Sequence, residues 1–105
     1  MGSFLAVNKD RVKNNGHVFV AKVDRDKVVV GRCKGSDKLS AILVVAADWA
    51  DKGKLPSVSI VKFKKVRNMV EAEARLHSYL ADFLVPSGRF YEISDKVLAE
   101  YWKEV

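Results

Sequence analysis

The sequence predicts a small α+β domain, in which a mixed, mainly antiparallel sheet of three to four strands is flanked by about three helices. Two observations carry this prediction. β-Branched and aromatic residues fill short runs such as 17–23 and 27–32, as they do in strands. Longer segments at 38–52 and 70–84 follow capping residues, and the second repeats apolar residues at the period of a helix with one buried face.

Length and composition favour one domain inside the cell. The chain has 105 residues, enough for a single hydrophobic core. It has no apolar run of the roughly 20 residues that a bilayer-spanning helix needs. Its single cysteine, Cys33, cannot form an internal disulfide, which fits a reducing compartment. We therefore expect a polar arm at 1–15, one domain at 16–105, no membrane partner and a cytoplasmic location.

Four strands are expected in an order that reads β-β-α-β-α-β-α. Residues 17–23 and 27–32 would form a hairpin, and neither run alternates cleanly between apolar and polar residues. Both strands are therefore expected in the centre of the sheet, covered on both faces. Residues 57–66 read as a third strand with a basic end, and residues 89–93 as a short fourth strand or extended piece.

The first helix is the least determined element. By periodicity alone, residues 41–47 fit a buried strand as well as a buried helix. A capping Asp37, a length of about 15 residues and a stop signal at 51–53 favour a helix over 38–52. The later helices have clearer starts, at Asn68 and at Ser94. In the last helix, an apolar side would face the body of the domain, formed by Val97, Leu98, Tyr101 and Trp102.

Glu73 stands inside the apolar stripe of the second long helix. Met69 and Leu76 lie one turn away on either side, and His77 follows four residues later on the same side. A carboxylate among apolar neighbours needs a cation, a metal or hydrogen bonds. Two interpretations remain open: a pair with a histidine or arginine at the helix edge, and a metal-binding or catalytic glutamate.

The basic charge points to an anionic partner without identifying it. The formal net charge is +6, which fits nucleic-acid binding but also fits an ordinary solvated surface. The basic residues gather in three groups along the chain: Lys9, Arg11 and Lys13; Arg32, Lys34 and Lys38; and Lys62, Lys64, Lys65 and Arg67.

Short motifs in this order resemble the GIY-YIG superfamily of endonuclease domains, over roughly residues 17–93. The likeness is nearest to the phage-associated subfamily with an E-x-x-L-H helix, here Glu73, Leu76 and His77, followed by Gly88-Arg89-Phe90-Tyr91. Residues 16–20 lie where the family has its GIY-like element, and residues 29–31 where it has its YIG-like element.

The resemblance implies a phosphodiesterase that uses a divalent metal. Glu73 would hold Mg²⁺ or Mn²⁺. In a rewired site, His77 would serve as the general base and Arg32 would have to reach the phosphate. Four positions depart from the family. Phe19 stands at its first tyrosine, and Val29 stands where many members carry a second. Ser40 stands where its first helix carries an arginine, and Arg89 replaces an acidic residue common in the subfamily. We therefore expect a catalytically weak or inactive domain of phage or mobile-element origin, whose remaining function is to bind nucleic acid, with DNA favoured.

The expected nucleic-acid contacts are basic residues near these motifs: Arg32, Lys34, Lys38, Lys62, Lys64, Lys65, Arg67 and Arg89. Two alternatives stay open. One is an active metal-dependent endonuclease with a rewired site. The other is a phage or mobile-element protein that uses the scaffold to bind a host protein, through Trp49 and its loop or through Tyr101 and Trp102.

Overall fold

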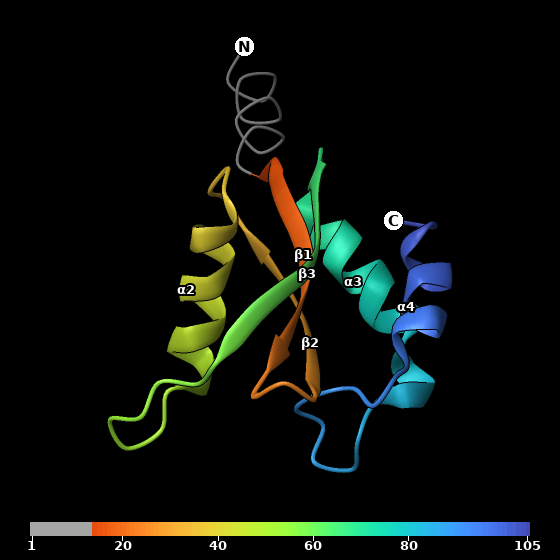
Figure 1. The fold of residues 1–105 in the computed structure, drawn as a ribbon. Coiled ribbons are helices and arrows are strands. Elements are labelled where there is room, and N and C mark those ends of the chain that lie inside the picture. The colour runs from red at the N-terminus through yellow and green to blue at the C-terminus, as the bar shows by residue number, and fades with distance from the viewer. Residues whose placement is uncertain (1–13) are drawn as a thin grey trace.

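The computed structural model describes residues 14–105 (Figure 1). It confirms the α+β class, with one antiparallel sheet in the strand order β2-β1-β3. The strands are β1 (Gly16–Val23), β2 (Lys27–Cys33) and β3 (Val58–Val66). The helices in this part of the chain are α2 (Lys38–Trp49), α3 (Met69–Tyr79), the 3₁₀ turn η1 (Ala81–Phe83) and α4 (Asp95–Trp102). The predicted arm at 1–15, with Lys9, Arg11 and Lys13, lies almost wholly outside the described residues.

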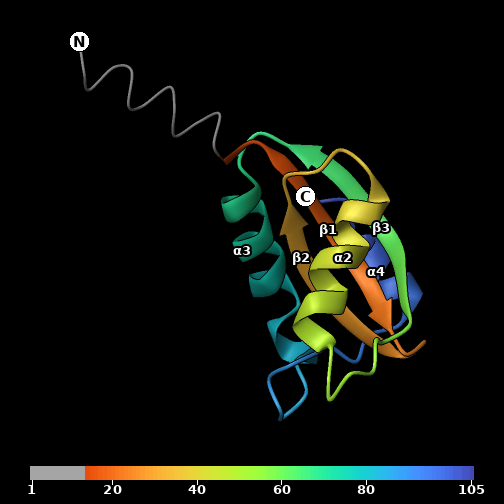
Figure 2. The same ribbon diagram turned by 90° about the vertical axis from the view of Figure 1, so that its left-hand side faces the viewer.

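The sheet is the middle layer of three (Figures 1 and 2). Strand alternation sends Phe19, Ala21 and Val23 of β1 to the face covered by α2. Val18 and Val20 point to the opposite face, where α3 and α4 pack. Each face has its own buried cluster, so the two helical layers are held by separate apolar contacts on one sheet.

β1 is the central strand, but β2 is not. β1 pairs along its length with β2 on one side and β3 on the other. β2 lies at an edge, so the prediction that both hairpin strands are central was wrong for residues 27–32. Val28 and Val29 are buried and Val30 is partly buried, because helices cover both faces of the sheet. An apolar run of this kind gives no sign that the strand lies at an edge.

The predicted fourth strand at 89–93 is not formed. Only Tyr91 makes a bridge to β2, opposite Val28, and it also bridges Leu84. The preceding chain closes a loop in which Val85 N–H donates to the Phe90 carbonyl at 3.0 Å. That loop bends the backbone away from β2 just before Tyr91, so pairing does not propagate into a strand.

The helices begin where the capping residues predict, but end earlier. Asp37 accepts a hydrogen bond from the Ser40 main-chain N–H at 3.0 Å, and Asn68 accepts one from that of Glu71 at 3.1 Å. α2 is therefore a helix, as favoured. It ends at Trp49, and a turn closed by hydrogen bonds between Asp51 and Lys54 replaces its predicted last residues. α3 ends at Tyr79, and η1 occupies most of the rest of the predicted 70–84 helix.

Candidate functional site

Glu73 is held by an arginine from the neighbouring strand. It projects from α3 toward β2, and its side chain is 19% exposed. Its Oε1 atom lies 3.3 Å from a guanidinium nitrogen of Arg32 and 3.5 Å from Nε2 of His77. Arg32 and α3 share one face of the sheet, which is why residues far apart in sequence meet here. The carboxylate inside the apolar stripe is thus received by a cation and an imidazole, as the first of the two interpretations expected.

The polar contacts continue from His77 to Tyr91. The Tyr91 hydroxyl is hydrogen-bonded to Nδ1 of His77, so both ring nitrogens of the histidine face a polar group. Burial, and secondarily the negative charge of Glu73, raises the pKa of the Tyr91 hydroxyl above its ordinary value. Tyr91 therefore stays a neutral hydrogen-bond donor. These contacts form a chain of polar side chains, Arg32, Glu73, His77 and Tyr91, which we call the polar chain.

A cleft of about 590 Å³ lies between α2, β2, α3 and the loop before Tyr91. Phe19 lies beneath β2 at this cleft and is fully buried. A Cβ atom on Gly31 would stand 2.5 Å from Cζ of this ring. The Phe19 ring is therefore part of the core, and its close packing explains why residue 31 is a glycine.

Arg89 is fixed against the opposite wall of the cleft. Its guanidinium stacks on the Trp49 ring, 4.1 Å from the ring centroid, and donates a hydrogen bond to the Asp48 carbonyl at 3.1 Å. Trp49 also contacts Phe90, with ring centroids 6.2 Å apart. These contacts hold the exposed Arg89 side chain at the cleft. Arg32, by contrast, is held by its ion pair with Glu73.

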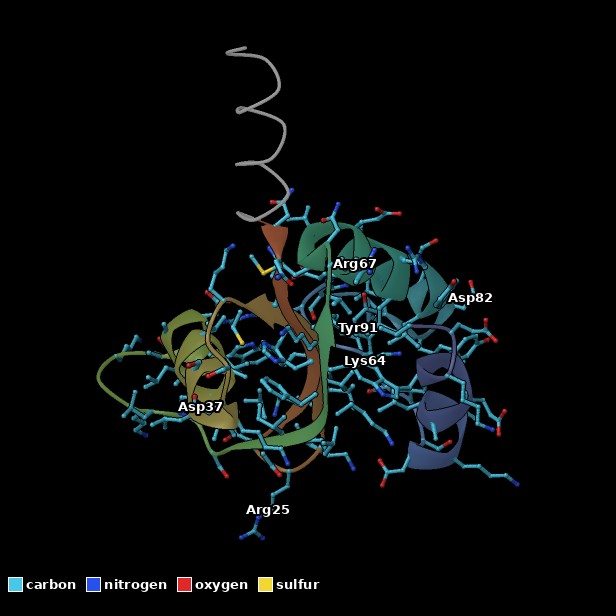
Figure 3. The ribbon with its side chains drawn as sticks, turned by 90° about the horizontal axis from the view of Figure 1, so that it is seen from above. Arg25, Asp37, Lys64, Arg67, Asp82 and Tyr91 are labelled. Carbon is cyan, nitrogen blue, oxygen red and sulfur yellow. The ribbon has the colours of Figure 1, made fainter. Side chains whose placement is uncertain are left out.

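Several basic residues gather at one end of the sheet, in the upper part of Figure 1. His17 at the start of β1 pairs with Cys33 on one side and Lys65 on the other, so the ends of β2 and β3 flank it at roughly 10 Å from each other. In Figure 3, which looks onto this end, Arg67 lies beside the start of α3. We call this group the cationic end. Its members are Arg32, Lys34, Lys38, Lys65 and Arg67.

Strand alternation divides the basic end of β3. Lys62 and Lys64 lie opposite Val20 and Val18, so they point to the face of α3 and α4. There the Lys64 ammonium donates to the main-chain oxygen of Val105. Lys65 points to the other face. Lys64 thus shares a face with Arg32 but is engaged by Val105, and Lys62 lies two residues farther from this end of the strand. Of the four residues, we therefore include only Lys65 and Arg67 in the cationic end.

The surroundings of Glu73 do not fit a preformed metal centre. Within residues 14–105 no group of three or more histidine, cysteine or acidic side chains is placed to hold an ion. The single carboxylate here already shares Oε1 with a guanidinium and an imidazole. A Mg²⁺ ion prefers several oxygen ligands and no adjacent cation. Mg²⁺ or Mn²⁺ at Glu73 stays a prediction, and we derive no chemical step through it.

Other candidate residues have packing roles. Cys33 is buried, and burial, with the nearby charge of Asp37, raises the pKa of its thiol, which makes it a poor nucleophile. Trp49 is only partly exposed, and Tyr101 and Trp102 pack at the margin of the core cluster on the α3 side. Among the described residues, Nδ1 of His17 is the one buried side-chain nitrogen or oxygen with no hydrogen-bond partner.

No family model, curated protein or solved structure matches this chain. The GIY-YIG resemblance and the phage origin therefore stay predictions. No helix in the described part of the chain is long and apolar enough to cross a membrane. Nothing in the sequence pairs Tyr91 with His77 specifically. The sequence offers only the general expectation that the hydroxyl of a buried tyrosine needs a hydrogen-bond partner.

Proposed function

We propose that this domain binds nucleic acid, with DNA favoured, through the cationic end. The observation that carries the proposal is the strand register, which brings two groups of basic residues from separate parts of the sequence to one end of the sheet. Phosphates are the anions that a surface of several lysines and arginines neutralises best. The function is therefore contact with a nucleic-acid backbone, without base recognition.

Three side chains of the cationic end have charges that are available to a ligand. Within residues 14–105, Lys38, Lys65 and Arg67 have no carboxylate within salt-bridge distance. Asp37 is the nearby acid, and its carboxylate is engaged as the cap of α2. Unpaired surface cations keep their hydration and counterions until a polyanion displaces them, and this release is a main source of affinity for nucleic acid.

Impaired catalysis is part of the same proposal. The ring at position 19 carries no hydroxyl and is buried, and Glu73 is already paired with Arg32. Neither residue can supply its expected chemistry without rearrangement. The domain would thus retain the scaffold of a nuclease and use it to hold a nucleic acid that it does not cut.

Binding to a labelled 20-base-pair duplex, measured by fluorescence anisotropy at low salt, tests the proposal. We expect the double variant Lys65→Glu, Arg67→Glu to bind on the order of tenfold more weakly, and the salt dependence of its binding to fall by about two phosphate contacts. The matched control is Lys52→Glu, Lys54→Glu, which makes the same change in net charge in an exposed loop at the other end of the molecule.

The control variant distinguishes binding at a defined surface from binding that depends only on the net charge of the protein. If both double variants lose affinity equally, binding depends only on net charge and the cationic end is not a site. A third variant, Lys62→Glu, Lys64→Glu, should lose less affinity than Lys65→Glu, Arg67→Glu, because Lys64 is engaged by Val105 and Lys62 lies farther from this end of the sheet. If the wild-type protein does not bind at low salt, the proposed function fails.

A second candidate function is a working endonuclease with a rewired site. The polar chain favours it, because His77 lies at the cleft with a carboxylate on one ring nitrogen and a hydroxyl on the other. An imidazole held in this way resembles a general base. Plasmid cleavage in Mg²⁺ or Mn²⁺ that Glu73→Ala and His77→Ala both abolish would establish it, and cleavage that persists in both variants would come from a contaminant.

A further inference from the structure

The outer edge of β2 is only partly paired. Val28 directs its main-chain groups away from β1, where its carbonyl accepts from Tyr91 N–H at 2.7 Å and its N–H donates to the Tyr91 carbonyl at 3.4 Å. In an antiparallel pair every second residue points the same way. Val30 and Arg32 therefore also direct an N–H and a C=O group outward. No described residue forms a main-chain hydrogen bond with these four groups.

This open edge lines the cleft at Val30, and Arg32 follows just beyond the cleft lining. The cleft lining includes the backbone segment 29–31 of β2 together with apolar side chains from both sides: Val44 from α2, and Ala81 and Leu84 near η1. The side chains of Val44 and Leu84 are 37% and 43% exposed, which is high for residues of their size. The cleft therefore offers unpaired main-chain groups along one side and apolar walls beside them.

We infer that this cleft binds an extended, acidic peptide segment of a partner protein, which pairs with β2 at Val30 and Arg32. A ligand that satisfies these groups must present N–H and C=O groups alternately at the spacing of a strand. An extended peptide does so, and its alternate side chains can reach the apolar walls. A nucleic-acid backbone offers phosphate acceptors but no such alternation. Tyr91 already provides the first pair of this ladder at Val28.

Charge determines which peptides fit. Arg89 is fixed at the cleft by Trp49, and Arg32 lies at the end of the open edge with its side chain 44% exposed. Two carboxylates also stand nearby: Glu73 is paired with Arg32, and Asp48 lies on the α2 wall. Arg89 is therefore the cation at the cleft that has no carboxylate within salt-bridge distance among the described residues. A segment with acidic residues flanking apolar ones complements the charge at this wall of the cleft.

A fluorescein-labelled hexapeptide, Glu-Val-Thr-Val-Glu-Thr, is a suitable probe, with binding followed by anisotropy and by amide shifts of the ¹⁵N-labelled protein. Two versions are compared, N-methylated at the odd or at the even residues. We expect one version to bind at least about tenfold more weakly and the other to bind nearly as the parent, because alternate N–H groups face β2 or solvent. The amide signals of Val30 and Arg32 should shift in the parent complex.

Three outcomes would overturn the inference: no binding at peptide concentrations of about 1 mM, equal loss of affinity for both methylated versions, and shifts confined to residues outside the cleft. A lysine version of the peptide and the variant Arg89→Ala should both weaken binding. Displacement of the peptide by the 20-base-pair duplex, with the same loss of duplex affinity in Arg89→Ala, would assign the cleft to nucleic acid instead. The cationic end is tested separately with Lys65→Glu, Arg67→Glu, so the two proposals can fail independently.

Discussion

The two ends of the sheet differ in the balance of their charges. At the end with the β1–β2 turn, acidic and basic residues alternate in sequence: Asp24, Arg25, Asp26 and Lys27, then Asp51, Lys52 and Lys54. Here Lys27 lies 3.5 Å from Asp26, so part of the charge is paired locally. At the cationic end, by contrast, Lys65 and Arg67 have no carboxylate partner among the described residues.

The difference shows that net charge alone says little about a binding surface. A value of +6 spread evenly over the molecule would favour solubility and no site in particular. Antiparallel pairing instead places the ends of β2 and β3 on either side of the start of β1. The register of the sheet therefore brings two separated basic segments to one end of the molecule, while the opposite end stays nearly balanced.

Arg32 is the exception at the cationic end, because its guanidinium is paired with Glu73. We expect Arg32→Ala to lower the free energy of unfolding by about 1–3 kcal/mol, since it leaves a carboxylate of low exposure without its cation. Urea unfolding measures this loss. The expected decrease in DNA affinity is smaller than for Lys65→Glu, Arg67→Glu, because Arg32 must leave Glu73 to contact a phosphate.

The double variant Arg32→Ala, Glu73→Leu is the control for this prediction. Removal of both partners leaves no unpaired charge on an otherwise apolar helix face, so most of the lost stability should return. If the double variant is as unstable as the single one, Arg32 contributes through packing of its side chain and the ion pair is not important to stability.

A substitution at Arg25 shows whether the end with the β1–β2 turn contributes to DNA binding. Arg25 has a φ of +76°, and Asp24 before it has a φ of +51°, the conformation of a tight hairpin turn that favours glycine at the second position. Arg25→Gly should raise the free energy of unfolding by roughly 0.5–1 kcal/mol by relieving this strain. DNA affinity should not change. A loss of affinity comparable to that of Lys65→Glu, Arg67→Glu would extend the binding surface to this end.

Tyr91 gives a smaller effect, visible only at alkaline pH. Because its pKa in the folded protein is raised above the ordinary value of 10.0, the unfolded chain loses this proton first as pH rises. The stabilisation is complete below pH 10 and is lost as pH rises through the folded pKa. Tyr91→Phe should therefore unfold with a weaker pH dependence above pH 10. Cys33, whose pKa is raised from 9.0, keeps a residual dependence of the same sign in both proteins.

The local signals in the sequence were sufficient for most of the fold. Asp37, Asn68 and Ser94 marked the helix starts because each cap is an interaction within a few residues. The position of β2 at an edge and the single bridge at Tyr91 could not be predicted, because both depend on contacts between distant segments. The fourth strand was predicted because residues 89–93 favour β structure. It does not form because the loop before Tyr91 turns the backbone away from β2.

The candidate site was predicted only in part for the same reason. Glu73 stood out because a carboxylate in an apolar stripe is anomalous by itself, and His77 follows at helical spacing. The pairing of Glu73 with Arg32 depends on which face of β2 meets α3, and that requires the register. The separation of Lys62 and Lys64 from Lys65 follows from strand alternation, and was available once residues 58–66 were taken as a strand.

The salt dependence of binding to a labelled DNA duplex tests the central claim most directly. If the cationic end contacts about four phosphates, the logarithm of the association constant should fall linearly with the logarithm of salt concentration, with a slope of about −3 to −4. A slope near zero, or no binding at low salt, would contradict the claim that this end of the sheet is a nucleic-acid surface.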